Sequence, residues 1–263
     1  MPNKQPPAVY AGMPHPVVEF DAIDSTNNEG HRRAAAGERG PLWLRADRQL
    51  SGRGRSGRQW ASPAGNFSAT FLFTPEGAEP AVYHHLSFVS GVAAWDALNA
   101  AGADAGALQL KWPNDLMMAG AKLGGILVES SRYDGRGVLL VGIGINLSVA
   151  PPVPGREVTQ LAAHGVATTP ADLLRRLGAA MEHWLAAWDG GRGFPAVREA
   201  WLARAHPIGS RVTVTGRDTS FAGTFQGIGC DGNLELSSET GELLSVTHGD
   251  VSLVRGQERD GET

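Results

Sequence analysis

The sequence predicts an α+β fold, in which a mixed β-sheet with flanking helices is joined near residue 208 to a small C-terminal β-barrel. Two observations lead to this class. Before residue 208, segments with the alternating pattern of strands are separated by helical segments. After it, short alternating strands are punctuated by glycine turns, and no apolar period long enough for a helix remains. A length of 263 residues with 42% hydrophobic residues is sufficient for such cores.

The first elements lead into a glycine-rich loop. Residues 1–16 are proline-rich and are expected to form a flexible lead. Thr26 and Glu29 have capping-box spacing, which predicts a helix that ends at Gly37 and whose entrance holds Ser25. Predicted strands on either side of the loop cover residues 41–49 and 66–73.

Two longer helices follow in the middle of the chain. One begins near residue 84 and ends at Gly102. It holds the adjacent His84 and His85, to which we assign a structural role because no second pair stands at metal-ligand spacing. The other is amphipathic and begins at Thr169, and its aromatic stripe indicates core packing. The predicted strands between these helices cover residues 108–112, 122–130 and 137–148.

The end of the chain completes the predicted domain organisation. A shorter helix is expected over residues 194–205, and about five strands then form the barrel. The last residues are polar and are expected to be frayed. The predicted segments are a lead at 1–16, one domain at 17–207, a second at 208–256 and a tail at 257–263.

Composition limits the classes of function. The chain has 23 Lys and Arg against 27 Asp and Glu, and the net charge of -4 gives no overall attraction to nucleic acid or anionic lipid. Cys230 is the only cysteine, which excludes an internal disulfide framework and a cysteine-based zinc site. The N-terminus lacks the pattern of a signal peptide, and no apolar stretch approaches the roughly 18 residues of a membrane span. A cytoplasmic protein without a membrane or nucleic-acid partner is expected.

The loop at residues 52–60, GRGRSGRQW, contains the spacing GxGxxG but fits neither common nucleotide-binding motif. A dinucleotide-binding fold needs a helix that begins inside the loop, and Pro63 interrupts any such helix. A P-loop needs Gly-Lys-Ser/Thr, which is absent. What remains is a flexible segment that carries Arg53, Arg55 and Arg58, whose forked donors suit phosphate. A solvated basic surface loop is the alternative, and the loop alone does not decide between them.

A second segment, residues 111–129, places polar side chains after an apolar strand. Asn114 and Asp115 belong to the turn-forming run WPND, so we expect them at a strand end rather than within a ladder. Lys122 begins the next strand, and two following glycines leave room for a ligand or another backbone. The alternative is a hairpin in which Lys122 merely protects a sheet edge.

A third segment ends in GIGINLS, residues 142–148. Gly142 and Gly144 alternate with bulky apolar residues and give the strand one smooth face, and the polar Asn146 ends it. Such a face suits a flat, mostly apolar ligand. Glycine also permits close packing of a strand against a helix, so this alternative stays open.

Together and in this order, five motifs resemble those of the biotin protein ligases. They are DSTN at 24–27, RQLSGRGRSGRQW at 48–60, KWPNDL at 111–116, KLGGILVE at 122–129 and GIGINL at 142–147. The resemblance covers roughly residues 17–256, and the joint occurrence is far more specific than any one motif. It implies the α+β core of the biotin and lipoate ligases with an SH3-like C-terminal barrel.

The resemblance implies a two-step reaction with ATP and biotin as substrates. The biotin carboxylate attacks the α-phosphate of ATP to give biotinyl-5'-AMP and pyrophosphate, and a lysine amine of a carrier protein then displaces AMP. The implied acceptor is the biotin carboxyl carrier domain of a carboxylase. Mg²⁺ is expected with the nucleotide, but its ligands stay open because phosphates and water hold most of its shell. The oligomeric state, including a homodimer, is also left open.

The resemblance assigns site residues as well. Lys122, Arg55 and Asp115 form the implied catalytic set, and Arg55 is expected to retain the reactive intermediate. Asp115 either polarises the carrier lysine or orients phosphates and Mg²⁺, and both roles stay open. Biotin contacts are implied for Ser25, Thr26, Asn27, Gln49, Arg53, Gly54, Arg55, Trp60 and Lys122. Contacts with ATP or the adenylate are implied for Arg53, Arg55, Arg58, Asn114, Asp115, Lys122 and Asn146.

One departure from the family pattern and two rival functions bear on this interpretation. Bifunctional members carry an N-terminal DNA-binding domain, whereas about 16 residues precede the expected core here, so repression of transcription is not expected. A lipoate or octanoate ligase or transferase is the nearest rival, and the complete glycine loop, KWPND and the barrel argue against it. A nucleic-acid-binding module is more remote, because the arginine run lacks interleaved aromatic residues.

Overall fold

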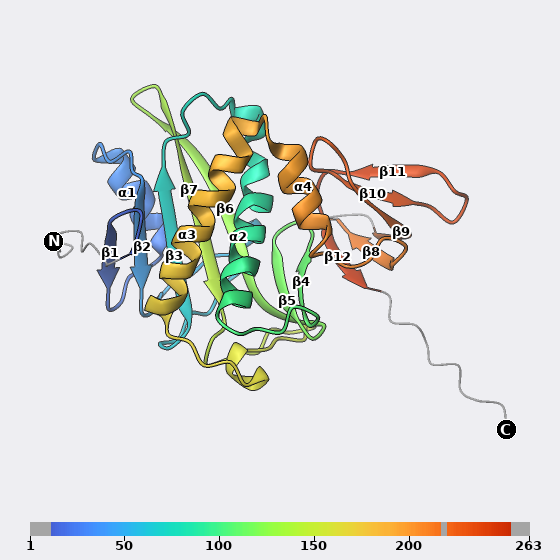
Figure 1. Cartoon of the computed structure of the whole chain (residues 1–263), viewed down its shortest axis with the longest axis horizontal. Coiled ribbons are helices and arrows are strands. Elements are labelled where there is room, and N and C mark those ends of the chain that lie inside the picture. Colours follow the sequence, from blue (N-terminus) through green and yellow to red (C-terminus); the bar gives the residue numbers. More distant parts are fainter. Residues whose placement is uncertain (1–11, 217–219, 254–263) are drawn as a thin grey trace.

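The computed structural model describes residues 12–216 and 220–253. Residues 1–11 of the expected lead and the expected tail at 257–263 lie outside this part. Within it, the chain forms two β-sheets and four α-helices (Figure 1). The helices are α1 (Thr26–Ala35), α2 (Leu86–Ala100), α3 (Pro170–Trp188) and α4 (Phe194–Leu202). Short 3-10 turns cover Arg55–Gly57, Pro80–His85, Leu161–His164 and Asp189–Gly191.

The larger sheet has seven strands, and it is mixed, as the sequence predicted. Only its β1–β2 pair is parallel among the described strands, and every other neighbouring pair is antiparallel. In spatial order the strands are β1 (Val17–Phe20), β2 (Leu42–Ala46), β3 (Phe67–Phe73), β7 (Arg136–Ile145), β6 (Ala121–Tyr133), β5 (Asp115–Met118) and β4 (Leu108–Lys111).

The two faces of this sheet carry different partners because side chains alternate along β7. Leu139 and Val141 join the main core with residues of α2 and α3, which cross one face of the sheet (Figure 1). Leu140 belongs to a smaller cluster with Ala34 of α1 on the other face. Gly142, two residues further on, therefore faces the α1 side, and this side holds the candidate site.

The C-terminal part forms a five-stranded antiparallel sheet, again as predicted. Hydrogen bonds join it to the core, since the Trp112 indole donates to the Gly232 carbonyl at 3.1 Å and a His84 ring nitrogen lies 2.7 Å from the Asp231 carbonyl. In spatial order its strands are β11 (Leu243–Val246), β10 (Leu234–Ser237), β9 (Ser220–Ile228), β8 (Arg211–Thr215) and β12 (Asp250–Leu253).

The surroundings of Asp115 differ from the prediction. Only the turn Trp112–Pro113–Asn114 is irregular, and β5 begins directly at Asp115, which pairs with Lys111 and Gly125. Asp115 thus lies at a strand end, as expected, but it is 7% exposed and paired on both sides, so the expectation that it lies outside a ladder is wrong. The reason is a tight hairpin whose second strand, DLMM, is too short and too poor in β-branched residues to be recognised by pattern.

The predicted capping box at α1 is also wrong. Ser25 is the N-cap and makes no side-chain capping bond, and the Thr26 hydroxyl instead contacts Gln49. Glu29 binds Arg32 at 2.8 Å and Arg33 at 2.9 Å. Tertiary partners thus replace the local cap.

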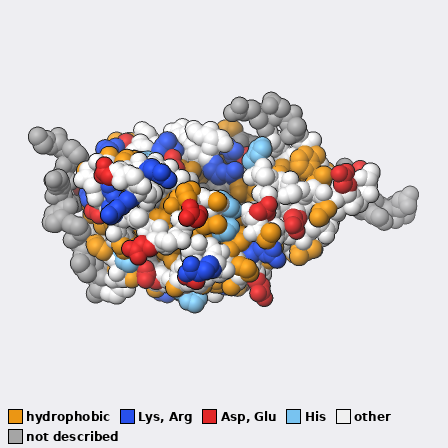
Figure 2. All heavy atoms as spheres, turned by 90° about the horizontal axis from the view of Figure 1, so that it is seen from above, with side chains coloured by type: hydrophobic (Ala, Val, Ile, Leu, Met, Phe, Trp, Pro, Cys, Tyr) orange, Lys and Arg blue, Asp and Glu red, His pale blue; other side chains and the backbone are white. Residues whose placement is uncertain are grey.

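On the face shown in Figure 2, acidic and basic side chains are interspersed. None of the described helices is both long enough and apolar enough to cross a membrane.

Candidate active site

A cavity of about 450 Å³ lies beside the α1 face of the larger sheet. Its walls come from the start of α1, the glycine loop, the β4–β5 turn, β6, β7 and the segment after β7. Every site residue predicted from the sequence lines it: Ser25, Thr26, Asn27, Gln49, Arg53, Gly54, Arg55, Arg58, Trp60, Asn114, Asp115, Lys122 and Asn146. Segments more than 100 residues apart thus converge on one space.

The glycine loop is folded rather than a loose surface loop. The Gly54 amide donates to the Arg58 carbonyl at 2.7 Å, and the Trp60 amide donates to the Gly52 carbonyl at 2.9 Å. A Cβ at Gly52 would lie 2.4 Å from the Trp60 carbonyl oxygen, so this turn requires glycine. The closed turn directs arginine side chains to the cavity wall, which favours the anion-binding interpretation over a solvated loop.

The glycines of β7 make room for cavity-lining side chains. A Cβ at Gly144 would lie 2.5 Å from the Trp60 indole nitrogen, and one at Gly142 would lie 2.4 Å from Asn27 Oδ1. Gly142 therefore serves strand-to-helix packing, the alternative left open by the sequence, and Gly144 accommodates Trp60. The smooth face shapes the cavity indirectly, through the side chains that rest on it.

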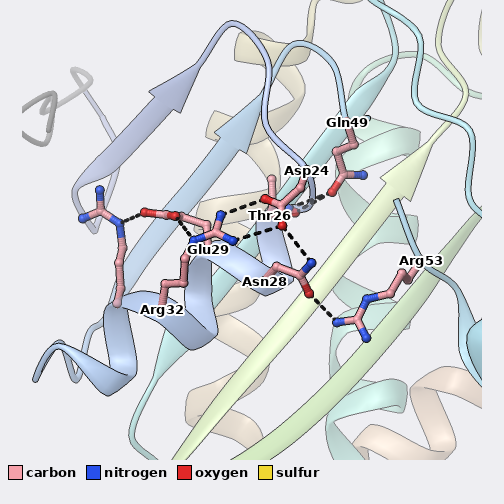
Figure 3. A network of polar contacts seen from close by, with 8 residues as sticks. Asp24, Thr26, Asn28, Glu29, Arg32, Gln49 and Arg53 are labelled. Atoms are coloured by element: carbon pink, nitrogen blue, oxygen red, sulfur yellow. Dashed lines mark hydrogen bonds and ion pairs between the residues drawn. The ribbon is translucent and has the colours of Figure 1, made fainter. Parts of the chain in front are cut away.

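A buried network of neutral polar groups occupies the α1 end of the cavity. Gln49 Oε1 accepts from the Thr26 backbone amide at 2.8 Å and from the Thr26 hydroxyl at 3.1 Å (Figure 3). The Thr70 hydroxyl lies 2.7 Å from Thr26 Oγ1 and 2.6 Å from Asn27 Oδ1. Gln49 Nε2 donates to Ser62 Oγ at 2.9 Å. Sequence reasoning missed Thr70, because it lies within the largely apolar strand β3.

Charged groups gather at the β5–β6 side. Lys122 Nζ lies 2.5 Å from Asp115 Oδ1, and Lys111 Nζ lies 3.2 Å from Asp115 Oδ2. Burial by itself raises the pKa of Asp115, but the charges of Lys122 and Lys111 outweigh it and hold this pKa below the ordinary value. Burial lowers the pKa of Lys122, against the opposing effect of Asp115. The result is a buried cluster with more positive than negative charge.

Lys122 does not protect a sheet edge. Its backbone amide donates to the Glu157 carbonyl and its carbonyl accepts from the Thr159 amide, both at 2.9 Å, so the chain after β7 covers this side of β6. The Lys122 ammonium lies 5.8 Å from the centre of the Trp60 ring. The edge-strand alternative is therefore excluded, and the side chain faces the cavity.

Two charged residues of the cavity wall, one basic and one acidic, were missed. Arg156 lies in the segment after β7, and Asp250 comes from β12 of the C-terminal sheet. Asp250 Oδ2 lies 2.5 Å from Arg58 Nη2 and 2.9 Å from Arg156 Nη2. No local pattern distinguishes Asp250 from other strand carboxylates, so only the docking of the C-terminal sheet could identify it.

The remaining predicted residues are held by polar contacts. Arg55 Nη1 donates to Asn114 Oδ1 at 3.3 Å, and burial lowers the pKa of Arg55. Asn146 Nδ2 donates to the Thr159 carbonyl at 3.1 Å. Among the described residues, no group of three or more His, Cys, Asp or Glu side chains is placed to share a metal ion.

Comparison with known proteins agrees with the motifs and the cavity. Residues 19–148 match the biotin/lipoate A/B protein ligase family, and residues 208–254 match the biotin protein ligase C terminal domain. A biotin–(acetyl-CoA-carboxylase) ligase of Paracoccus denitrificans is 41% identical over 229 residues, which cover 84% of this chain and 94% of that protein. The chain belongs to the biotin protein ligases.

Further biotin protein ligases show the same relation. A biotin–(acetyl-CoA-carboxylase) ligase of Mycobacterium tuberculosis is 32% identical, over 88% of this chain and 86% of that protein. The biotin protein ligase of Aquifex aeolicus, solved in complex with biotin and ATP, aligns with a TM-score of 0.75 and 26% identity, over 91% of this chain and 99% of that one. These matches confirm the predicted α+β core, the SH3-like C-terminal part and the assignment as a ligase.

Proposed function

We propose that the chain is an ATP-dependent biotin protein ligase whose acceptor is the biotin carboxyl carrier domain of a carboxylase, and that it acts in the cytoplasm. The observation that carries this proposal is one cavity with a neutral hydrogen-bonding network at one end and a cationic cluster at the other. A ureido ring needs matched neutral donors and acceptors, whereas a carboxylate that meets a triphosphate needs preplaced positive charge.

In the first step, a biotin carboxylate oxygen bonds to the α-phosphorus of ATP while the bond to the bridging oxygen of the β-phosphate breaks. Pyrophosphate leaves with that electron pair, and biotinyl-5'-AMP remains. Lys122, Arg53 and Arg55 are proposed to stabilise the charge that develops around phosphorus, because their cationic groups line the cavity. Arg58, Asn114 and Asn146 are proposed as further contacts with the nucleotide.

In the second step, the carrier lysine amine attacks the acyl carbon, an amide bond forms and AMP leaves with the electron pair of the broken acyl–oxygen bond. The carrier lysine gives one proton to solvent before it attacks, because a free lysine, with a pKa of about 10.4, is mostly protonated at neutral pH. It gives a second proton to solvent as the amide forms. Asp115 is already engaged with Lys122 and Lys111, which supports a role in orienting Lys122 during the first step.

The ureido end is proposed to bind through Ser25, Thr26, Asn27, Gln49 and the Gly54 backbone, with Trp60 as an apolar wall. The support is the position of these groups around the buried network. Mg²⁺ is proposed as a companion of ATP. The two carboxylates of the cavity, Asp115 and Asp250, are both occupied by cationic side chains, so this site does not resemble a protein-built metal cage.

Biotin-dependent exchange of label between pyrophosphate and ATP tests the proposal with the full chain. Exchange with biotin, and transfer of biotin to a purified carrier domain, are the expected results. Lipoate and octanoate are tested in parallel. Exchange with these acids but not with biotin would indicate a lipoate or octanoate ligase instead. The absence of exchange with any of the three would contradict adenylation.

A further inference from the structure

Arg53 is held by Asn28 and Glu129, two residues to which the resemblance assigns no role. Its Nη2 donates to Asn28 Oδ1 at 2.7 Å, which joins the glycine loop to the first turn of α1 (Figure 3). On the other side, Arg53 Nη2 lies 3.3 Å from Glu129 Oε1 of β6. The Arg53 side chain is 41% exposed, so these two contacts restrict a group that would otherwise move freely in solvent.

The orientation of the Asn28 amide is determined by a chain of contacts behind it. Arg32 binds Asp24 through two hydrogen bonds, at 2.7 and 3.0 Å, and Asn28 Nδ2 donates to Asp24 Oδ2 at 2.9 Å (Figure 3). The hydrogen bond from Arg32 holds the pKa of Asp24 well below its usual range, so Asp24 can only accept. The amide nitrogen of Asn28 must therefore face Asp24, and its oxygen is left to face Arg53.

Glu129 links Arg53 to the biotin end of the cavity. Asn27 Nδ2 donates to Glu129 Oε2 at 2.8 Å, and Asn27 Oδ1 in turn contacts Thr70 of the buried network. His31 Nε2 lies 3.4 Å from Glu129 Oε2. The same carboxylate therefore contacts one residue of the proposed biotin site and one arginine of the loop.

We propose that Asn28 and Glu129 are positioning residues, which act on adenylation by holding the Arg53 guanidinium at the cavity wall. The inference rests on the proposed function, because Arg53 matters only if an anionic substrate binds beside it. Neither residue needs to touch the substrate. Because the Asn28 amide already restricts the Arg53 side chain, Arg53 loses less entropy when it binds an anion. Glu129 connects the position of Arg53 to that of Asn27.

A double-mutant cycle on the full chain tests this role. Asn28→Ala is expected to lower kcat/KM for ATP in biotin-dependent exchange about tenfold. In a chain that already carries Arg53→Ala, the same substitution is expected to change kcat/KM by less than about twofold, because the group it positions is gone. Glu129→Gln, which keeps an acceptor for Asn27 but removes the ion pair, is expected to show the same dependence on Arg53. Asn99→Ala, at an exposed position of α2, is the matched control and should leave the rate unchanged.

The outcomes separate this inference from the proposed function. Equal losses with and without Arg53 would mean that Asn28 only supports the fold, and would overturn the positioning role while leaving the ligase assignment intact. Unchanged exchange in both Asn28→Ala and Glu129→Gln would overturn it as well. No biotin-dependent exchange by the unmodified chain would overturn the proposed function and this inference together. Thermal unfolding of each variant identifies losses caused by misfolding, and Glu129→Gln retains the test if Asn28→Ala fails to fold.

Discussion

Lys122 and Asp115 form a buried ion pair at the wall of the cavity, with 2.5 Å between Nζ and Oδ1. Their side chains are 18% and 8% exposed. A second ammonium, that of Lys111, lies 3.2 Å from the other oxygen of Asp115. Two lysines thus share one carboxylate, and of these Lys122 lines the cavity in which anions are proposed to meet.

Replacement of Lys122 by Ala is expected to abolish most adenylation. The substitution removes a largely buried cation from the wall of the cavity in which the carboxylate and ATP are proposed to meet. The loss in biotin-dependent exchange should be at least about 100-fold. Asp115 keeps Lys111 as a partner, so the fold should survive, which thermal unfolding can verify. A variant that is folded and exchanges at the unmodified rate would remove Lys122 from the mechanism.

Asp115→Asn separates the two roles that the sequence left open for this residue. Because its contacts are with Lys122 and Lys111, we expect biotinyl-AMP formation to fall more than transfer from supplied biotinyl-AMP to a carrier domain. The two half-reactions are measured separately, by exchange and by label on the carrier. A larger loss in transfer would instead indicate that Asp115 acts on the acceptor lysine.

Arg55→Ala is expected to weaken retention of the intermediate. Arg55 is held by Asn114 at the cavity wall, and its charge is suited to the adenylate phosphate. We expect severalfold more free biotinyl-AMP in solution during turnover and labelling of lysines on an added bystander protein. Arg192→Ala, which removes an exposed arginine remote from the cavity, is the control. Tight retention by the Arg55 variant would contradict this role.

Gly144→Ala tests whether the bare strand face shapes the biotin site. The added Cβ would lie within 2.5 Å of the Trp60 indole nitrogen, so the ring must move. Biotin binding, measured by calorimetry, is expected to weaken about tenfold, which matches the usual cost of overpacking. Gly106→Ala is the matched control, since a Cβ there would meet nothing closer than 3.7 Å. Equal affinity in the two variants would mean that Trp60 does not line the biotin site.

His85 predicts a pH dependence of stability. Its ring stacks on Phe194 at 3.6 Å, Trp188 Nε1 donates to its Nδ1 at 3.3 Å, and burial together with His84 lowers its pKa from 6.5 to about 4. Below pH 6.5 His85 becomes protonated in the unfolded chain, whereas in the folded chain it stays neutral until about pH 4. The free energy of unfolding should therefore decrease as the pH falls through this window, by as much as ~3 kcal/mol.

Urea unfolding at several pH values between 4 and 7.5 measures this effect. His206, whose pKa is also lowered by burial, contributes with the same sign, so the comparison is between the unmodified chain and His85→Phe. The variant loses the acceptor for Trp188 and should be less stable at pH 7, but its stability should depend less on pH. An equal slope in both chains would exclude His85 as the main titrating group.

Local sequence could predict the groups of the site but not their arrangement. Lys122, Asn114 and the loop arginines stand in motifs with recognisable turn and glycine chemistry, and all of them line the cavity. Thr70, Arg156 and Asp250 carry no local signal, because their role depends on which strand or domain lies opposite. The burial of Asp115 was missed for a related reason, since the short strand β5 is stabilised by its two neighbours rather than by its own composition.

The sequence by itself determined the class of the chain: a mixed sheet with helices, a five-stranded C-terminal part and the ordered motifs of a biotin protein ligase. Periodicity and turn residues are local along the chain, and the order of the motifs is read directly from the sequence. Only the tertiary structure decided that Asn28 and Glu129 hold Arg53, that Asp250 joins Arg58 to Arg156, and that Lys122 and Lys111 share one carboxylate. Hydrogen bonds and ion pairs act over a few ångströms, so they are fixed only when folding brings distant segments together.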